Sequence, residues 1–317
     1  MTKVTIVITS LLLMLGSNLT FAEAPATDFD ALENAPKVEI PIVAFHKSYD
    51  ETKLAYYKFN STEQSDRAVI VLHGGGAHSL SGYQHLADTL SREYSTNVYL
   101  VDLRGHGRSK GRRGDAPRAN SIKKDLKSFV KFTKKQNKLV YVLGHSSGAG
   151  LLLNYISWKK KIEVDGYFFV SPQFGHKAKI ERDNPTTPPF ATIKLYKFII
   201  AQSTFGLFYG HSPAVHFNYP AKVLARDPLI NTFITRHMSV GMTPKKPVKQ
   251  FKKIDQKYGL FTGERDNLLD PLKVTKYCDY ATEDINKQSA CEILYQGHLS
   301  ILLKVGHNVG ELILNWN

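Results

Sequence analysis

The stretch Lys138-Leu-Val-Tyr-Val-Leu-Gly-His-Ser-Ser-Gly-Ala-Gly150 decides the fold class of this chain. Its apolar residues Leu139 to Leu143 predict a buried strand, and Ala149 to Trp158 continues with a helical pattern. A Gly-x-Ser-x-Gly turn between a strand and a helix is typical of a nucleophile elbow, which holds the serine in strained backbone geometry. The sequence therefore predicts that Ser146 projects its hydroxyl from the top of a sheet as a nucleophile.

Outside this stretch, apolar strands alternate with amphipathic helices, which indicates a parallel sheet covered on both faces. Residues 38–47 and 53–59 predict an antiparallel opening pair of strands. The chain has 317 residues, 42% of them hydrophobic, so we expect an α/β fold with a mostly parallel twisted sheet flanked by helices. The strands expected in the parallel part are 68–72, 97–102, 139–143, 164–170, 258–262 and 292–295.

Between Pro172 and Gln256 the regular alternation stops. This segment is rich in proline and aromatic residues, and only two helices are predicted in it, at about 190–203 and 219–237. So long an interruption exceeds an ordinary loop in a compact domain. We therefore expect an inserted, mainly helical cap over residues 172–256, on a core formed by residues 37–171 and 257–317.

The N-terminal sequence predicts export. Residues 1–22 begin with one positive charge, continue with an apolar run and end at Ala22. This is the pattern of a secretory signal peptide, cut after Ala22 or, alternatively, after Ala24. A membrane anchor is less favoured, because threonines interrupt the run and it is shorter than about 20 residues. The mature protein would begin with a loose segment, residues 23–36, and would be periplasmic or secreted.

Export changes how the two cysteines are interpreted. Cys278 and Cys291 both lie in the mature chain, and an oxidising compartment favours disulfides. We predict that they pair with each other, with two buried free thiols as the alternative.

The formal net charge is +14, and two lysine-rich stretches, 121–135 and 244–253, contribute much of it. The first places apolar residues at helical spacing with lysines on the other face, as in a solvated helix. A basic protein of this kind would associate weakly with an anionic membrane surface, although solubility alone explains the charge. We find no nucleic-acid module and no metal-ligand spacing in the sequence, so we expect no nucleic-acid partner and no metal.

Two loops that follow predicted strands carry the partners that a serine nucleophile needs. They are Gly263-Glu-Arg-Asp266 and Gln296-Gly-His298. A histidine can move a proton to and from a serine at neutral pH, and a carboxylate can orient that histidine. We predict Asp266 as the acid and His298 as the base, in the chain order Ser…Asp…His.

Each of these two assignments has a rival. Asp270 lies four residues after Asp266, but it precedes Pro271, where a helix is expected to begin. His307 would follow a strand over 301–305, whereas His298 leaves a full helix, 299–316, to close the sheet.

A glycine-rich loop, His73-Gly-Gly-Gly-Ala77, follows the first parallel strand. A tetrahedral oxyanion needs backbone N–H donors, and glycines let the main chain approach it closely. We predict that the N–H groups of Gly75 and Ser147 are the two donors. An ordinary glycine turn is the alternative.

Together these segments resemble the α/β-hydrolases of the monoacylglycerol lipase and lysophospholipase group, often described as serine aminopeptidase-like. The resemblance runs from about Val38 to the end of the chain. Its most specific part is Val98-Tyr-Leu-Val-Asp-Leu-Arg-Gly-His-Gly-Arg-Ser109, which is similar to the family's Asp-x-Arg-Gly-His-Gly-x-Ser stretch. The family often has methionine or another bulkier residue where this chain has Ser147, and Asp102 is interpreted as structural.

The residues and the resemblance together imply an exported serine hydrolase that cleaves carboxylic esters through a Ser-His-Asp triad and an acyl-enzyme, with no cofactor. The aromatic cap favours a small-molecule ester with an apolar acyl chain, unless these rings only pack the cap on the sheet. One alternative is an aminopeptidase or amidase of the same fold, and another is a catalytically silent binding protein. The aromatic residues in question are Phe190, Tyr196, Phe198, Phe205, Phe208 and Tyr209.

Overall fold

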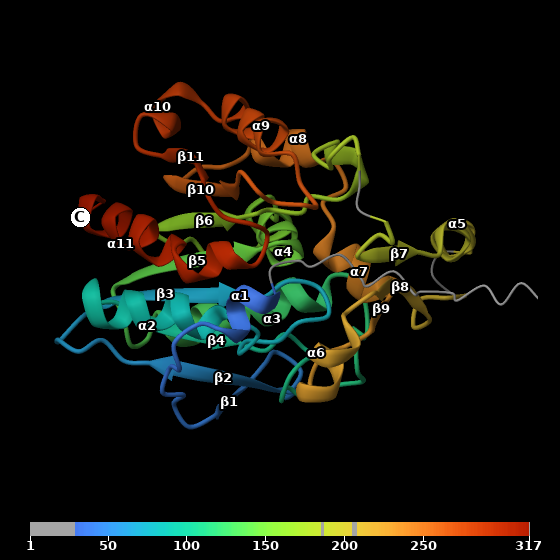
Figure 1. Ribbon diagram of the computed structural model, residues 1–317, viewed down its shortest axis with the longest axis horizontal. Helices are drawn as coiled ribbons and strands as arrows, with labels where there is room; N and C mark the ends of the chain where they lie inside the picture. Colours follow the sequence, from blue (N-terminus) through green and yellow to red (C-terminus); the bar gives the residue numbers. More distant parts are fainter. Residues whose placement is uncertain (1–28, 185–186, 205–207, 317) are drawn as a thin grey trace, which may run out of the picture.

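The computed structural model describes residues 29–184, 187–204 and 208–316. Its centre is an eight-stranded sheet in the order β1-β2-β4-β3-β5-β6-β10-β11 (Figure 1). The β1–β2 and β2–β4 pairs are antiparallel and the other pairs are parallel, which confirms the predicted mostly parallel sheet. The strands are β1 (Ala44–Lys47), β2 (Lys53–Phe59), β3 (Arg67–Leu72), β4 (Asn97–Val101), β5 (Leu139–His145), β6 (Gly166–Val170), β10 (Tyr258–Gly263) and β11 (Ala290–Leu294).

Helices cover both faces of the sheet. One face packs against α2 (Tyr83–Glu93) and α11 (Val305–Asn315), and the other against α3 (Ser121–Thr133) and α4 (Ser147–Ile156). Alternate residues of a strand point to opposite faces, so Val71 of β3 joins the first core and Ile70 joins the second. Apolar strands with this burial on both sides produce the layered fold that the sequence predicts.

Two predicted elements have different bounds. The first strand begins at Ala44 rather than at residue 38, and Pro41 lies in the part that is not paired. Proline has no N–H to donate to a strand ladder. The expected final helix is divided into a 3-10 helix, η3 (Ser300–Leu303), and α11.

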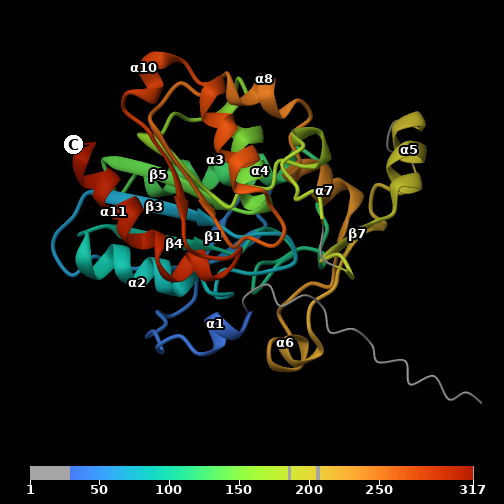
Figure 2. The same ribbon diagram turned by 45° about the horizontal axis from the view of Figure 1, so that its top comes forward.

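The cap is mainly helical, as expected, but it also holds strands that the sequence did not predict. It contains a three-stranded antiparallel sheet of β7 (Ala191–Ile193), β8 (Pro213–Phe217) and β9 (Phe233–Thr235). These strands pair with segments distant in sequence, which local periodicity does not reveal. The helices expected at about 190–203 and 219–237 are shorter in the structure. In Figures 1 and 2 the cap lies beside one end of the sheet, with α5 farthest away. Its helices are η1 (His176–Ala178), α5 (Leu195–Ser203), α6 (Ala221–Arg226), α7 (Arg236–Met242) and α8 (Pro247–Phe251).

The described part of the N-terminal segment contains a short helix that the sequence did not predict. The predicted signal peptide, residues 1–22, and residues 23–28 lie outside the described residues, but Phe29–Glu33 of the segment predicted to be loose forms a helix, α1. This five-residue helix has no apolar periodicity, so its position comes from contacts with the core and the cap rather than from a pattern of its own. Across the described ranges, no helix combines the length and apolar character needed to cross a membrane.

Cys278 and Cys291 form the predicted disulfide, which joins the 3-10 helix η2 (Lys276–Tyr280) to β11. The edge strand β11 leads directly to the loop that carries His298. The disulfide therefore restrains the strand from which this loop begins. Two short helices, α9 (Pro271–Thr275) and α10 (Glu283–Asn286), complete the segment between β10 and β11.

Candidate active site

Ser146 stands at the sharp turn between β5 and α4. Its backbone has φ 52° and ψ −124°, a strained combination for a residue other than glycine. Two hydrogen bonds stabilise the turn: Ser146 N–H donates to the Val170 carbonyl, and the Ser146 carbonyl accepts from Gln173 N–H, each at 3.0 Å. Only glycine fits at position 148, where a Cβ would lie 2.3 Å from the Leu72 carbonyl oxygen. The elbow geometry expected from Gly-x-Ser-x-Gly is present.

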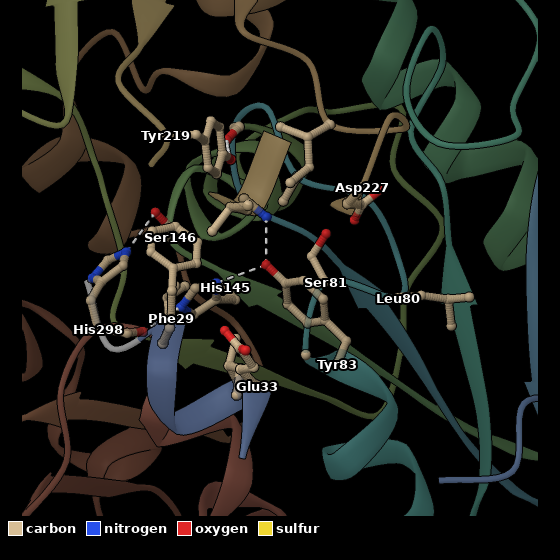
Figure 3. A pocket seen from close by; sticks show the side chains of 18 of the residues that line it. Phe29, Glu33, Leu80, Ser81, Tyr83, His145, Ser146, Tyr219, Asp227 and His298 are labelled. Carbon is tan, nitrogen blue, oxygen red and sulfur yellow. Dashed lines mark hydrogen bonds between the residues drawn. The ribbon is translucent and has the colours of Figure 1, made fainter. Parts of the chain in front are cut away.

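The predicted acid and base lie in line with this serine. Nε2 of His298 is 3.1 Å from Oγ of Ser146 (Figure 3). Nδ1 of His298 is 2.8 Å from Oδ2 of Asp266. Because the carboxylate can only accept, Nδ1 carries the proton and Nε2 is left to accept from the serine hydroxyl. The structure thus brings together all three residues from three separate loops.

Asp266 is fully buried, and its second oxygen is also occupied. Its Oδ1 accepts the N–H groups of Leu268 and Leu269, each at 2.9 Å. Burial alone would raise the pKa of Asp266, but the neighbouring His298 and these hydrogen bonds together hold it below its ordinary value. The carboxylate is therefore ionised at neutral pH and fixed in one orientation toward His298.

The two rivals have other partners. Asp270 is the N-cap of α9, where its carboxylate accepts from the N–H groups of Leu272 and Lys273. His307 lies on α11, with its Nδ1 3.3 Å from the Tyr94 hydroxyl and 3.6 Å from the Glu93 carboxylate. Neither position is part of the Ser146–His298–Asp266 chain of hydrogen bonds.

A second chain of hydrogen bonds, which the sequence did not predict, links three loops of the site. The Tyr83 hydroxyl accepts from Gly74 N–H and donates to Nδ1 of His145, each at 2.8 Å (Figure 3). Nε2 of His145 then donates to the backbone carbonyl of His298 at 2.9 Å. These hydrogen bonds fix the positions of the glycine loop, the elbow and the base loop relative to one another. The only sequence signal was the position of His145 beside the nucleophile.

Neutral buried histidines support this region. Burial lowers the pKa of His73, His106 and His145 to about 3 in each case. His145 accepts a hydrogen bond at Nδ1, and His73 accepts one from Leu103 N–H at Nε2. Protonation of Nδ1 in His145 or of Nε2 in His73 would turn the accepting nitrogen into a donor and break its hydrogen bond.

We expect the protein to lose stability as the pH falls below about 6.5. In the unfolded chain these histidines bind a proton near that pH, whereas in the folded protein they stay neutral until about pH 3. The stability that these neutral histidines contribute is therefore present above about pH 6.5, and it is lost progressively as the pH falls from there toward about 3. The three together would lower the free energy of unfolding by about 4 kcal/mol at pH 5.5. Urea unfolding at pH 7.5, 6.5 and 5.5 measures this, and a constant free energy across the series would contradict it.

The glycine loop lies directly against the elbow. A Cβ built on Gly75 would lie 3.1 Å from Oγ of Ser147 and 2.8 Å from the ring of Phe217. Ser147 is the first residue of α4, so its N–H has no acceptor within the helix and lies at the positive end of the helix dipole. The Gly75 carbonyl accepts from the Tyr219 hydroxyl at 3.1 Å, which fixes the peptide that follows. The predicted donors therefore come from neighbouring segments beside Ser146.

Asp102 has a structural role, as the sequence predicts. Its buried carboxylate accepts from the N–H of Ser79 at 2.8 Å and from the N–H of Arg108 at 2.7 Å. These bonds join the segment after the glycine loop to the Arg-Gly-His-Gly turn.

Two cavities open at Ser146 and His298. The larger, of about 270 Å³, extends toward α1, α2 and α6, and the smaller, of about 210 Å³, extends toward β7 and β8. Phe190 and Leu268 belong to the walls of both, so they separate the two spaces. A substrate with a chain on each side of a reacting carbonyl matches this arrangement.

The cap aromatics contribute less to these walls than the sequence suggested. Of the six residues considered, Phe190 lines the cavities, Phe205 lies outside the described residues, and Phe198 packs on the core. Phe217 and Tyr219, which the sequence did not single out, line the walls instead. The cap sheet places Phe217, the last residue of β8, at the smaller cavity, and Tyr219 follows two residues later at the larger one. The remaining three residues, Tyr196, Phe208 and Tyr209, are exposed.

Two cap carboxylates lie beside the cavities. Asp227 lines the larger one and is 2.6 Å from Nε2 of His78, and Glu181 lines the smaller one. In the part of the chain that the structure describes, no group of three His, Cys, Asp or Glu residues is placed to hold a metal ion.

Known proteins share both sequence and fold with this chain. It is 32% identical to the uncharacterized protein YnbC of Escherichia coli over 151 residues, which are 46% of the chain and 25% of YnbC. It is 31% identical to a monoacylglycerol lipase of Mycolicibacterium smegmatis over 101 residues, which are 31% of the chain and 36% of the lipase. The chain thus spans only part of the length of these relatives.

Solved structures extend the likeness in fold to nearly the whole chain. A soluble variant of monoglyceride lipase from Saccharomyces cerevisiae, in complex with a substrate analog, matches with a TM-score of 0.64 and 20% identity. The match covers 89% of this chain and 98% of the yeast chain. A family described as "Serine aminopeptidase, S33" matches residues 63–293, which contain the elbow, the glycine loop and the acid. This chain therefore belongs to that α/β-hydrolase family, with the fold of the monoacylglycerol lipase group.

Proposed function

We propose that this protein is an exported serine hydrolase that cleaves carboxylic esters of small molecules. One observation carries the proposal: the hydrogen-bonded chain from Ser146 through His298 to Asp266 opens onto two mostly apolar cavities. The similarity to a monoacylglycerol lipase supports an ester as the substrate. The signal-peptide pattern of residues 1–22 supports a periplasmic or secreted location.

The reaction would proceed in two halves. His298 Nε2 accepts the proton of Ser146 as Oγ bonds to the ester carbonyl carbon, and the N–H groups of Gly75 and Ser147 stabilise the resulting oxyanion. The oxyanion then collapses, the bond to the alcohol oxygen breaks, and His298 gives its proton to the leaving alcohol. Water, deprotonated by His298, attacks the acyl-enzyme and releases the acid, after which Ser146 recovers its proton.

Asp266 would act through His298. Its buried carboxylate keeps the Nδ1–H tautomer and stabilises the imidazolium that forms in each half-reaction. No step in this sequence needs a cofactor.

The cavity walls favour an apolar ester over a free amine. An aminopeptidase would need a carboxylate to hold the amine, and Asp227 is already paired with His78. Glu33, which lines the larger cavity, is likewise paired with Arg226. Glu181 beside the smaller cavity favours the amine alternative.

Hydrolysis of p-nitrophenyl esters with acyl chains of 2 to 16 carbons tests the function. We expect kcat/KM to rise from the acetate to a longer acyl chain, by roughly fourfold for each methylene that reaches an apolar wall. The comparison substrate is alanine p-nitroanilide, which carries a free amine. Faster cleavage of this amide than of any ester would reverse the assignment.

The outer part of the cap supports weak binding to an anionic membrane. Seven large apolar residues are exposed among the described residues of 193–209. Figure 2 shows α5, which carries four of them, far from the sheet, and the chain carries a net charge of +14. We expect the protein to sediment with phosphatidylglycerol vesicles at low salt, and Ile199→Asp to weaken this. Equal sedimentation with and without the substitution would contradict docking through α5. The exposed residues are Ile193, Leu195, Tyr196, Ile199, Ile200, Phe208 and Tyr209.

A further inference from the structure

Helix α1 forms an outer wall of the larger cavity. Phe29, Leu32 and Glu33 line it together with Ser146 and His298, and Figure 3 shows Phe29 and Glu33 on α1 beside this space. This helix precedes residues 63–293, the part that matches the family.

Contacts with the core place one side of α1. Leu32 fills the space beside Gly82, where a Cβ would lie 2.8 Å from Leu32 Cδ1. Gly82 is the N-cap of α2, with φ 97°, so the position also requires glycine for its backbone. Helix α1 also lies against η3, which follows the His298 loop.

Contacts with the cap place the other side. Asp30 pairs with Lys222, and Glu33 pairs with Arg226, both on α6. The Phe29 ring lies 5.7 Å from that of Tyr219, whose hydroxyl donates to the Gly75 carbonyl. Helix α1 thus bridges the core and the cap across the open side of the larger cavity.

The bonds that hold α1 are weak. The side chains of both ion pairs are between 41% and 62% exposed, and exposed pairs contribute little and are screened by salt. A five-residue helix has almost no stability of its own. A closure held in this way can open and reclose without unfolding the core.

We propose that α1 is a strap that closes the outer end of the larger cavity and so sets the length of apolar substrate chain that this cavity accepts. The proposal rests on the ester hydrolase function for its substrate, but the wall itself does not require catalysis. When α1 is in place, substrate acyl chains that reach Phe29 and Leu32 make apolar contact with them. Longer acyl chains collide with α1. When α1 is displaced, longer chains can extend past it.

Charge reversal at Asp30 tests the strap without altering the cavity, because neither Asp30 nor Lys222 is part of its lining. Asp30→Lys places two like charges together and should displace α1. We expect kcat/KM for p-nitrophenyl acetate within about twofold of wild type, and the preferred acyl chain to lengthen by at least two carbons. The double variant Asp30→Lys/Lys222→Asp restores an opposite pair and should restore the wild-type preference.

Salt provides an independent version of the same test. Raising NaCl from 0.05 to 0.5 M should shift the wild-type preference toward longer chains and narrow its difference from Asp30→Lys, because the same salt screens the repulsion in that variant. An unchanged preference in Asp30→Lys and in Phe29→Ala, with both variants folded by circular dichroism, would overturn the proposal.

Binding separates this proposal from the function. In the Ser146→Ala background, calorimetry measures the affinity for alkanoates of 4 to 16 carbons with no turnover. A shift of the tightest ligand to longer chains on Asp30→Lys supports the strap even if no ester is hydrolysed. Ester hydrolysis with no such shift leaves the enzyme assignment in place and overturns the strap.

Discussion

Replacing Ser146 with alanine is expected to abolish covalent labelling by a fluorophosphonate and to lower kcat for ester hydrolysis by a factor on the order of 10⁶. Its Oγ is the atom that would bond to phosphorus or to the acyl carbon, and the substitution leaves His298 with nothing to deprotonate. The effect should fall on kcat rather than on binding, because the cavity walls remain. Gel fluorescence and a stopped assay with a p-nitrophenyl ester measure the two losses.

The neighbouring serine provides a matched comparison. Ser147→Ala removes a hydroxyl that has no hydrogen-bond partner among the described residues, but it keeps the backbone N–H. We expect this variant to be labelled. Persistent labelling of the Ser146→Ala protein, or loss of labelling only in Ser147→Ala, would show that the nucleophile is assigned to the wrong residue.

Replacing Asp266 with asparagine is expected to lower kcat by about 10⁴-fold while the protein stays folded. An amide can donate to Nδ1 of His298, which places the proton on Nε2. The histidine would then present a donor to Ser146 and be unable to accept its proton. The loss should fall mainly on kcat, measured over pH 5 to 9, because Asp266 does not line either cavity.

Asp270→Asn is the control for this change, because it makes the same substitution four residues away. Asp270 caps α9, and asparagine is about as good an N-cap as aspartate, so activity and stability should both stay close to wild type. His298→Ala and His307→Ala form the corresponding pair for the base. A large loss of kcat on Asp270→Asn or His307→Ala would reject the assignments made from the sequence and the geometry.

The residues of the candidate site were predictable because each lies on a loop directly after a strand. In a parallel sheet these loops meet at one edge, so Ser146, Asp266 and His298 could be placed together although 120 residues separate the first two. The preference for Asp266 over Asp270 was predictable for a local reason, because Pro271 begins α9. Short-range rules of this kind depend on neighbouring residues only.

The second hydrogen-bond chain and the cavity walls were not predictable in this way. Nothing in the sequence around Tyr83 indicates a bond to His145, which lies 62 residues later. The inward position of Phe217 depends on the cap sheet, whose strands pair across long intervals. The small sheet within the mainly helical cap was not predicted for the same reason, since strand pairing depends on partners that periodicity does not identify.

By itself, the sequence determined the α/β fold, the elbow and the three residues that meet there, because apolar periodicity and glycine-dependent turns are local properties of a chain. Only the tertiary structure decided what surrounds them. The two cavities, the Tyr83–His145 link and the position of α1 arise from contacts between segments that are distant in sequence. A five-residue helix such as α1 carries no stability of its own, so its place over the larger cavity comes from the core and cap surfaces that it touches.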